Sequence, residues 1–290
     1  MSDPLCSMVE EGWVWLSVGL FSLIIGSFLN VVVFRLPRML QSRWRQECQL
    51  LLDLPVDPAS ERDFNLAVPG SHCPACQSPI PLRFNIPLLG YLFLKGHCHT
   101  CGDRISLRYP LLEGLALVLA LMAFEHFGCS AEWVFALIFL WMLLVLCFID
   151  MEHQWLPDSL TLPLLWLGLC LSVFNLYVPP EASILGAAIG YLCLWSVYWI
   201  FKGLTGRDGM GFGDFKLLAA LGAWVGWTGI PWILVIASCS GATFGIAMVL
   251  SGRMGRQAAF PFGPFLALGG AIVFLYPDHL ARIYRAWLDF

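Results

Sequence analysis

The sequence predicts an all-α polytopic membrane protein with about eight transmembrane helices and a small cytoplasmic insert between the first two. The 290-residue chain is 59% hydrophobic and only 12% charged, whereas soluble domains carry about a quarter of charged residues. Apolar segments of nearly 20 residues recur along it, and about 20 residues at 1.5 Å each cross the hydrocarbon core of a bilayer. A polar segment with paired cysteines separates the first apolar segment from the others.

Eight apolar segments are expected to form the helices. The sixth is short for a membrane span, so it could form one helix with the seventh. Gly226, Gly229 and Pro231 instead indicate a turn between the two segments. The eight segments are residues 13–34, 110–127, 133–149, 160–178, 182–201, 215–227, 230–250 and 262–276.

The distribution of Lys and Arg predicts the orientation in the membrane. With eight spans, fourteen of the sixteen Lys and Arg residues fall on one side and only Arg282 and Arg285 on the other. Basic loops face the cytoplasm, so both termini are expected outside. The tail of residues 1–12 has no Lys or Arg, unlike a cleaved signal peptide, so the first helix is expected to stay. A net charge of -4 argues against nucleic-acid binding.

The insert, residues 36–109, is predicted to hold a zinc ion. It contains two Cys-x-x-Cys pairs separated by 21 residues, a spacing typical of tetrahedral four-cysteine zinc sites. Disulfides or free thiols are the alternatives, but lasting disulfides are rare in the cytoplasm. His72, His97 and His99 lie nearby and could substitute as ligands. The predicted ligands are Cys73, Cys76, Cys98 and Cys101.

Two carboxylates on separate helices are candidates for acid and base. Asp150 follows the third apolar segment, and Asp214 lies in a glycine-rich stretch before the sixth. With eight spans both lie on the cytoplasmic face. An aspartyl protease needs one protonated and one ionised carboxyl group, and two carboxylates about 3 Å apart cannot both ionise. This pair could therefore activate water.

Other interpretations of these carboxylates are open. A single carboxylate at a helix end more often caps the helix, and Asp158 is typical of an N-cap. Asp208 in its glycine-rich loop is typical of a turn residue. A transporter would use intramembrane carboxylates to relay protons or bind cations, and a zinc-bearing membrane scaffold would tolerate the loss of both Asp150 and Asp214.

Several motifs occur in one order along the chain. A Gly-Ser-Phe-Leu-Asn stretch with Arg-Leu-Pro spans residues 26–37, the cysteine pairs follow, and Arg108-Tyr109-Pro110 precedes Glu113. Ile149-Asp150 with Leu156-Pro157-Asp158 comes next, and then residues 211–216, Gly-Phe-Gly-Asp-Phe-Lys. Together these motifs resemble the type IV prepilin peptidase family and cover nearly the whole chain.

The resemblance implies a bifunctional enzyme of the bacterial inner membrane. Asp150 and Asp214 correspond to the catalytic pair, supported by Gly211, Gly213 and Lys216. The implied substrates are type IV prepilins and type II secretion pseudopilin precursors, cut after a glycine at the cytoplasmic membrane face. The resemblance also implies methylation of the new N-terminus by S-adenosylmethionine. A protease without methylation, with a purely structural insert, is the alternative.

Further expectations concern methylation, the segment before the last helix and the division of the chain into parts. The resemblance links Gly96 and Glu113 to methylation. Residues 260–264, Phe-Pro-Phe-Gly-Pro, enter the membrane from the cytoplasmic side and could leave backbone groups free to pair with an extended substrate, or simply start a helix. The expected parts are a periplasmic tail 1–12, a first transmembrane helix 13–35, the methyltransferase-associated insert 36–109 and a seven-helix protease core 110–290.

Overall fold

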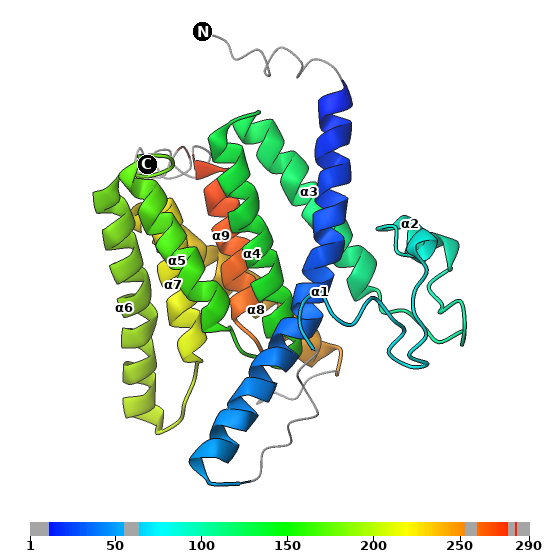
Figure 1. The fold of residues 1–290 in the computed structure, drawn as a ribbon. Helices are drawn as coiled ribbons and strands as arrows, with labels where there is room; N and C mark the ends of the chain where they lie inside the picture. The colour runs from blue at the N-terminus through cyan, green and yellow to red at the C-terminus, as the bar shows by residue number, and fades with distance from the viewer. Residues whose placement is uncertain (1–11, 55–63, 253–259, 278–281, 283–290) are drawn as a thin grey trace. The chain divides into compact units, whose positions relative to one another are not determined.

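The computed structural model is all-helical over the residues that it describes (Figure 1). The chain divides into two compact units, residues 1–129 and 130–290. Most of the expected periplasmic tail and the charged residues Arg253 and Arg256 lie outside the described residues. The described residues are 12–54, 64–252, 260–277 and 282.

The first unit contains two long helices, α1 (Gly12–Leu51) and α3 (Arg108–Phe127). They pack closely, because a Cβ atom added at Gly26 would lie only 3.1 Å from Cα of Glu113. Asn30 Nδ2 donates a hydrogen bond to the carbonyl oxygen of Tyr109 at 3.1 Å. The short helices η2 (Leu82–Phe84) and α2 (Leu89–Phe93) lie in the segment between them.

Helix α1 continues well beyond residue 34, where the apolar segment ends. Pro37 lies inside it and removes one backbone hydrogen bond, and the residues that follow are good helix formers. Arg35 is buried, and its Nη1 donates to the carbonyl oxygen of Asn65 at 2.9 Å while Nη2 donates to that of Pro69. The first residues of the insert thus belong to α1, and Arg35 attaches residues 65 and 69 of the insert to this helix.

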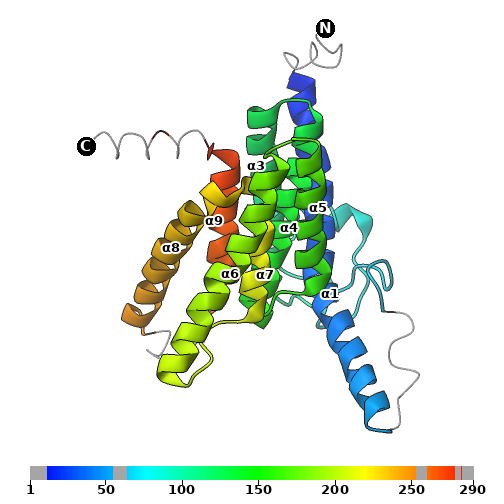
Figure 2. The ribbon, with the colours of Figure 1, turned by 90° about the vertical axis from the view of Figure 1, so that its left-hand side faces the viewer.

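The second unit contains six helices among its described residues, and Figure 2 shows them running alongside one another. A turn at Gly226, with φ of +75°, and the short helix η3 (Trp227–Gly229) separate α7 from α8. The helices are α4 (Ala131–His153), α5 (Asp158–Val173), α6 (Pro180–Thr205), α7 (Phe212–Val225), α8 (Ile230–Leu250) and α9 (Gly263–Leu275).

The protein is a polytopic membrane protein. Five helical segments of the described chain are long and apolar enough to cross a bilayer, while the total of eight spans stays a prediction. Helices α5 and α9 are shorter apolar helices. The five segments are Gly12–Leu51, Arg108–Phe127, Ala131–His153, Pro180–Thr205 and Trp227–Leu250.

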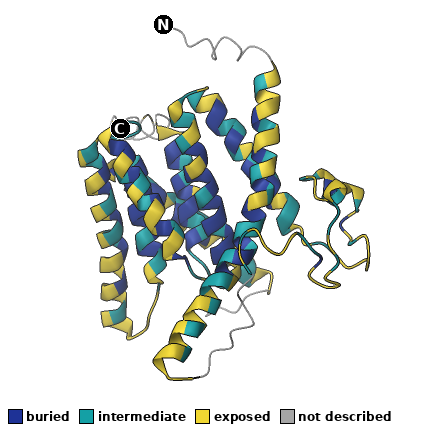
Figure 3. Cartoon of the chain, viewed as in Figure 1, coloured by how far each residue is buried: buried dark blue, intermediate teal, exposed yellow. Residues whose placement is uncertain are grey.

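Helix α7 lies at the centre of the second unit, and residues 217–224 are all buried (Figure 3). Backbones of α6 and α7 touch, because a Cβ added at Gly186 would lie 2.1 Å from the carbonyl oxygen of Gly222. The indole N–H of Trp224 donates to the carbonyl oxygen of Leu164 on α5 at 2.9 Å. These contacts fix α7, whose first turn carries Asp214.

Candidate active site and metal centre

Asp150 is buried in the last turn of α4, with 4% of its surface exposed. Its Oδ2 accepts a hydrogen bond of 3.0 Å from the backbone N–H of Gly263, the first residue of α9. A helix N-terminus presents free N–H groups and favours negative charge nearby. A Cβ at Gly263 would lie 2.6 Å from this oxygen. Only glycine lets the backbone approach the carboxyl group this closely.

Asp214 is buried in the first turn of α7, with 7% exposed. Its backbone N–H donates to the carbonyl oxygen of Gly211 at 3.2 Å. Its carboxyl group lies close enough to that of Asp150 for the two to interact electrostatically. Among the acidic side chains described in this unit, these two are the buried ones.

Leu156 brings the two aspartate segments together. A Cβ at Gly213 would lie 2.9 Å from Leu156 Cβ, and one at Gly263 would lie 3.2 Å from its Cδ1. The same buried side chain therefore packs against the residue before Asp214 and the residue that hydrogen-bonds Asp150. Leu156 and Gly263 belong to motifs of the sequence, but neither motif predicts these contacts.

Lys216 contacts Asp158 rather than either buried aspartate. Its Nζ donates to both carboxylate oxygens of Asp158 at 2.7 Å, across a partly exposed surface. The expectation that Asp158 is an N-cap was wrong: Pro157 occupies the N-cap position, and Asp158 is the first helical residue. The carboxylate instead links the start of α5 to α7.

Asp208 pairs with neighbouring polar groups on α6. Its Oδ1 lies 2.8 Å from Lys202 Nζ and accepts a hydrogen bond of 2.6 Å from the hydroxyl of Tyr198. The hydrogen bonds from Lys202 and Tyr198 hold the pKa of Asp208 below its usual value. An exposed, ionised and already paired carboxylate is a poor candidate for proton transfer.

The four insert cysteines form a compact cluster of sulfur atoms. All four Sγ atoms lie within 4.8 Å of one another, with Cys73 and Cys101 3.8 Å apart and Cys76 and Cys98 4.0 Å apart. Four thiolates at about 2.3 Å from one tetrahedral zinc ion have sulfur atoms about 3.8 Å apart. The donor set and its spacing therefore fit a zinc ion.

Each cysteine pair lies in a turn of the same form. Cys73 donates its N–H to the carbonyl oxygen of Ser78, and Cys98 donates to that of Asp103. The backbone N–H groups of Cys101 and Thr100 lower the pKa of the Cys98 thiol to about 6, which favours the thiolate form that binds metals.

The nearby histidines bind other groups. The Nδ1 atoms of His72 and His97 lie 2.8 Å from the carbonyl oxygens of Gly70 and Lys95, and His99 Nδ1 lies 2.8 Å from Thr100 Oγ1. None of these histidines belongs to the sulfur cluster in the described part of the chain. Cysteine alone supplies the four candidate ligands.

Gly96 and Glu113 both contact the segment of helix α2. Glu113 is buried, and its Oε2 accepts the N–H of Leu88, the residue before α2, at 2.8 Å. Ser27 on α1 also donates to the Glu113 carboxylate. Gly96 has φ of +74°, and a Cβ there would lie 2.7 Å from the hydroxyl of Tyr91 on α2. The two residues that the resemblance links to methylation thus both contact α2 or the residue before it.

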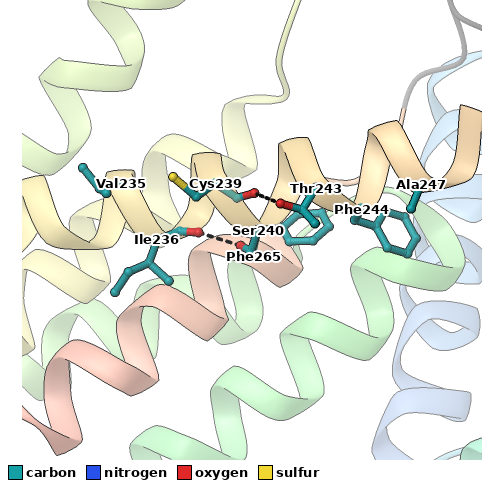
Figure 4. Close-up of a pocket in the computed structure, with 8 residues that line it drawn as sticks. All are labelled: Val235, Ile236, Cys239, Ser240, Thr243, Phe244, Ala247 and Phe265. Carbon is teal, nitrogen blue, oxygen red and sulfur yellow. Dashed lines mark hydrogen bonds between the residues drawn. The ribbon is translucent and has the colours of Figure 1, made fainter.

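A shallow open groove of about 720 Å³ runs along α8 beside Phe265 of α9 (Figure 4). Its two hydroxyl groups hydrogen-bond within their own helix: Ser240 donates to the carbonyl oxygen of Ile236 and Thr243 to that of Cys239. The groove therefore presents a largely apolar surface, as expected for a helix that faces lipid.

The fold and site define a polytopic membrane protein with a buried aspartate pair and a four-cysteine cluster that could hold a metal ion. Residues 137–246 match the type IV leader peptidase family, and residues 20–127 match the bacterial peptidase A24 N-terminal domain. The chain belongs to the type IV leader peptidase family, so the resemblance drawn from its motifs is confirmed.

Relatives along nearly the whole chain share one name, prepilin leader peptidase/N-methyltransferase. The protein of that name from Aeromonas salmonicida is 48% identical over 275 residues, 94% of each chain. The one from Dichelobacter nodosus is 48% identical over 92% of this chain and 93% of its own. The one from Pseudomonas aeruginosa is 44% identical over 93% of each. No solved structure matches the chain.

The contact between Gly263 and Asp150 gives a first prediction. Gly263→Ala should lower the rate of leader-peptide cleavage on the order of a hundredfold, because the added methyl group displaces the Asp150 carboxylate. Gly245→Ala is the matched control, since its Cβ would make only an ordinary contact of 3.6 Å with Phe260. Equal rates for the two folded variants would contradict this role of Gly263.

The sulfur cluster gives a second prediction. The purified protein should hold about one zinc ion per chain, and Cys73→Ser or Cys98→Ser should lose it. Elemental analysis measures the metal, and limited proteolysis should show cleavage confined to the insert. Cys48→Ser is the control, because this exposed cysteine on α1 lies outside the cluster. Active wild-type protein without zinc in reducing buffer would refute a structural zinc site.

Proposed function

We propose that this protein removes the leader peptide from type IV prepilins and type II secretion pseudopilin precursors and N-methylates the new N-terminal residue. The observation that carries the proposal is the burial of Asp150 and Asp214 at one end of one helical unit, in a chain of the type IV leader peptidase family. The names of its relatives include both activities.

In the proposed cleavage, the ionised carboxylate of the pair activates a water molecule. Asp150 takes this role because its Oδ2 already accepts a backbone N–H at the start of α9, which stabilises a negative charge. The water oxygen attacks the carbonyl carbon of the scissile peptide bond, and Asp150 accepts a water proton. Asp214 donates its proton to the carbonyl oxygen.

The second half of the reaction returns the pair to its starting state. The carbonyl oxygen gives its proton back to Asp214, the amine nitrogen takes the proton held by Asp150, and the carbon–nitrogen bond breaks. The leader leaves with a new carboxyl group, and the mature chain keeps a free amino group. That amino group is the nucleophile that methylation requires.

The two aspartates lie at helix ends, a position in the membrane that suits the proposed substrate. A prepilin has a basic leader in the cytoplasm and an apolar helix in the bilayer, so its scissile bond lies at the membrane surface. Asp150 ends α4 and Asp214 begins α7, whereas a carboxylate that relays ions across a membrane lies deeper along a helix. We place this site at the cytoplasmic face of the bacterial inner membrane, with both termini in the periplasm.

The insert has two proposed roles. Its cysteines hold a structural Zn²⁺ ion, which stabilises a segment that has little apolar core of its own. S-adenosylmethionine supplies the methyl group as a co-substrate. Within the insert, Gly96 positions Tyr91, and Glu113 of α3 holds the backbone at Leu88. We therefore assign residues 36–109, together with Glu113 of α3, to methylation and the rest of residues 110–290 to proteolysis.

The aspartate pair gives a third prediction. Asp150→Asn and Asp214→Asn should each abolish cleavage, because an amide can neither accept a proton from water nor donate one in the same way. Methylation of an already cleaved peptide should survive in both variants. Mass spectrometry of a prepilin peptide incubated with each variant in detergent measures both reactions.

Asp158→Asn is the control for this test. It removes a charged partner of Lys216 at a partly exposed site, where such a pair contributes on the order of 1 kcal/mol or less. It should therefore keep most of the cleavage activity. Near wild-type cleavage by either folded variant of the buried pair would show that the catalytic assignment is wrong.

Gly96 gives a fourth prediction. Gly96→Ala should lower methylation strongly and leave cleavage near the wild-type rate, because its methyl group would collide with Tyr91. Gly102→Ala is the control: Gly102 has nearly the same φ, +73°, but a Cβ there meets nothing within 4 Å. The two variants thus share the cost of a positive φ and differ in the contact. Equal methylation by both would exclude a role for the contact with Tyr91.

A further inference from the structure

Residues 82–95, termed here the α2 segment, expose an unusual amount of apolar surface. Leu82 is 87% exposed, and Leu92 and Phe93 are each 66% exposed. Ile86 and Leu89 are also exposed. Large apolar patches of this kind on a protein surface mark sites of contact with a partner or a membrane.

The backbone of the α2 segment is fixed within the first unit. Leu88 N–H donates to Glu113 Oε2, and the Glu113 carboxylate also accepts a hydrogen bond from Ser27 on α1. A Cβ at Gly90 would lie 2.1 Å from the carbonyl oxygen of Phe84, so α2 and η2 pack backbone against backbone. The exposed side chains therefore belong to a compact element attached to two candidate membrane spans.

The attachment point sets the depth of this element. Helix α3 has 20 residues and a length of about 30 Å, the thickness of a hydrocarbon core. Glu113 lies five residues after Arg108, where α3 begins, which is about 7.5 Å along the helix axis. Leu88 is hydrogen-bonded to Glu113, so the α2 segment lies at the level of the first turns of α3 (Figure 1).

The charges of the α2 segment suit a membrane surface. Arg83 and Lys95 are its charged residues, both are exposed, and no acidic residue lies between them. Protein elements that lie in the interface of an anionic membrane typically combine cationic side chains with exposed Leu and Phe. A soluble protein partner would not explain why the segment is attached at this depth.

We infer that the α2 segment inserts its apolar side chains into the lipid interface, with Arg83 and Lys95 at the anionic headgroups. The insert is then not wholly cytoplasmic: one part lies in the membrane surface, while the cysteine turns extend from it. Gly96 directly follows the segment and contacts Tyr91 within it. The methylation-linked glycine is thereby held at the membrane surface.

Photo-crosslinking to lipid tests this inference. In the full-length protein, the photoreactive amino acid p-benzoylphenylalanine replaces one residue of the segment (Leu92→p-benzoylphenylalanine). This variant is placed in vesicles of phosphatidylethanolamine and phosphatidylglycerol. After irradiation, mass spectrometry of the digested protein measures peptides with an attached lipid. The same residue at Ala75, exposed in the first cysteine turn, is the control. Lipid adducts at position 92 should exceed those at position 75 roughly tenfold.

Charge reversal provides the second arm of the test. Arg83→Glu with Lys95→Glu should reduce the adducts at position 92 in anionic vesicles and change them much less in phosphatidylcholine vesicles. Lipid adducts at position 92 no more frequent than at position 75 would overturn the inference. Crosslinks from position 92 to a second copy of the chain, in place of lipid, would overturn it as well and identify a protein interface.

Discussion

The arrangement of the catalytic candidates depends on one close contact, the approach of the Gly263 backbone to the Asp150 carboxylate. A buried carboxylate without a partner is costly, by several kcal/mol. The N–H of Gly263 supplies that partner, and it can do so because the residue has no side chain. Leu156 packs against Gly263 and Gly213 and so brings Asp214 to the same place. Replacing either glycine would disturb the positions of the two carboxylates of the proposed pair.

The two units hold different groups of candidate site residues. The second holds the buried aspartates, and the first holds the sulfur cluster, Gly96 and Glu113. Within the first unit Glu113 acts as a positioning residue, because its carboxylate joins α1 and α3 to the backbone at Leu88. This contact would account for the link to methylation that the resemblance implies for a residue of a membrane helix. Glu113 holds the backbone of the α2 segment, against which Gly96 packs.

Local sequence patterns predicted the structural features that depend on residues close together in the chain. The apolar segments became helices, and the cysteine spacing brought four sulfur atoms within 4.8 Å. Contacts between distant segments could not be predicted, because periodicity carries no information about them. Gly263 lies 113 residues from Asp150. The N-cap prediction for Asp158 was wrong, because its partner Lys216 lies 58 residues away in the sequence. Helix α1 continues past Pro37, because the loss of one backbone hydrogen bond does not end a helix.

In the proposed function, one chain cleaves a prepilin and methylates the product. The most direct measurement incubates the purified wild-type protein with a prepilin and S-adenosylmethionine, and then determines the mass of the mature chain. We expect loss of the leader and gain of one methyl group at the new N-terminus, and cleavage alone when the methyl donor is omitted. An uncut prepilin, or a cut product that stays unmethylated with the donor present, would show that the protein lacks the proposed pair of activities.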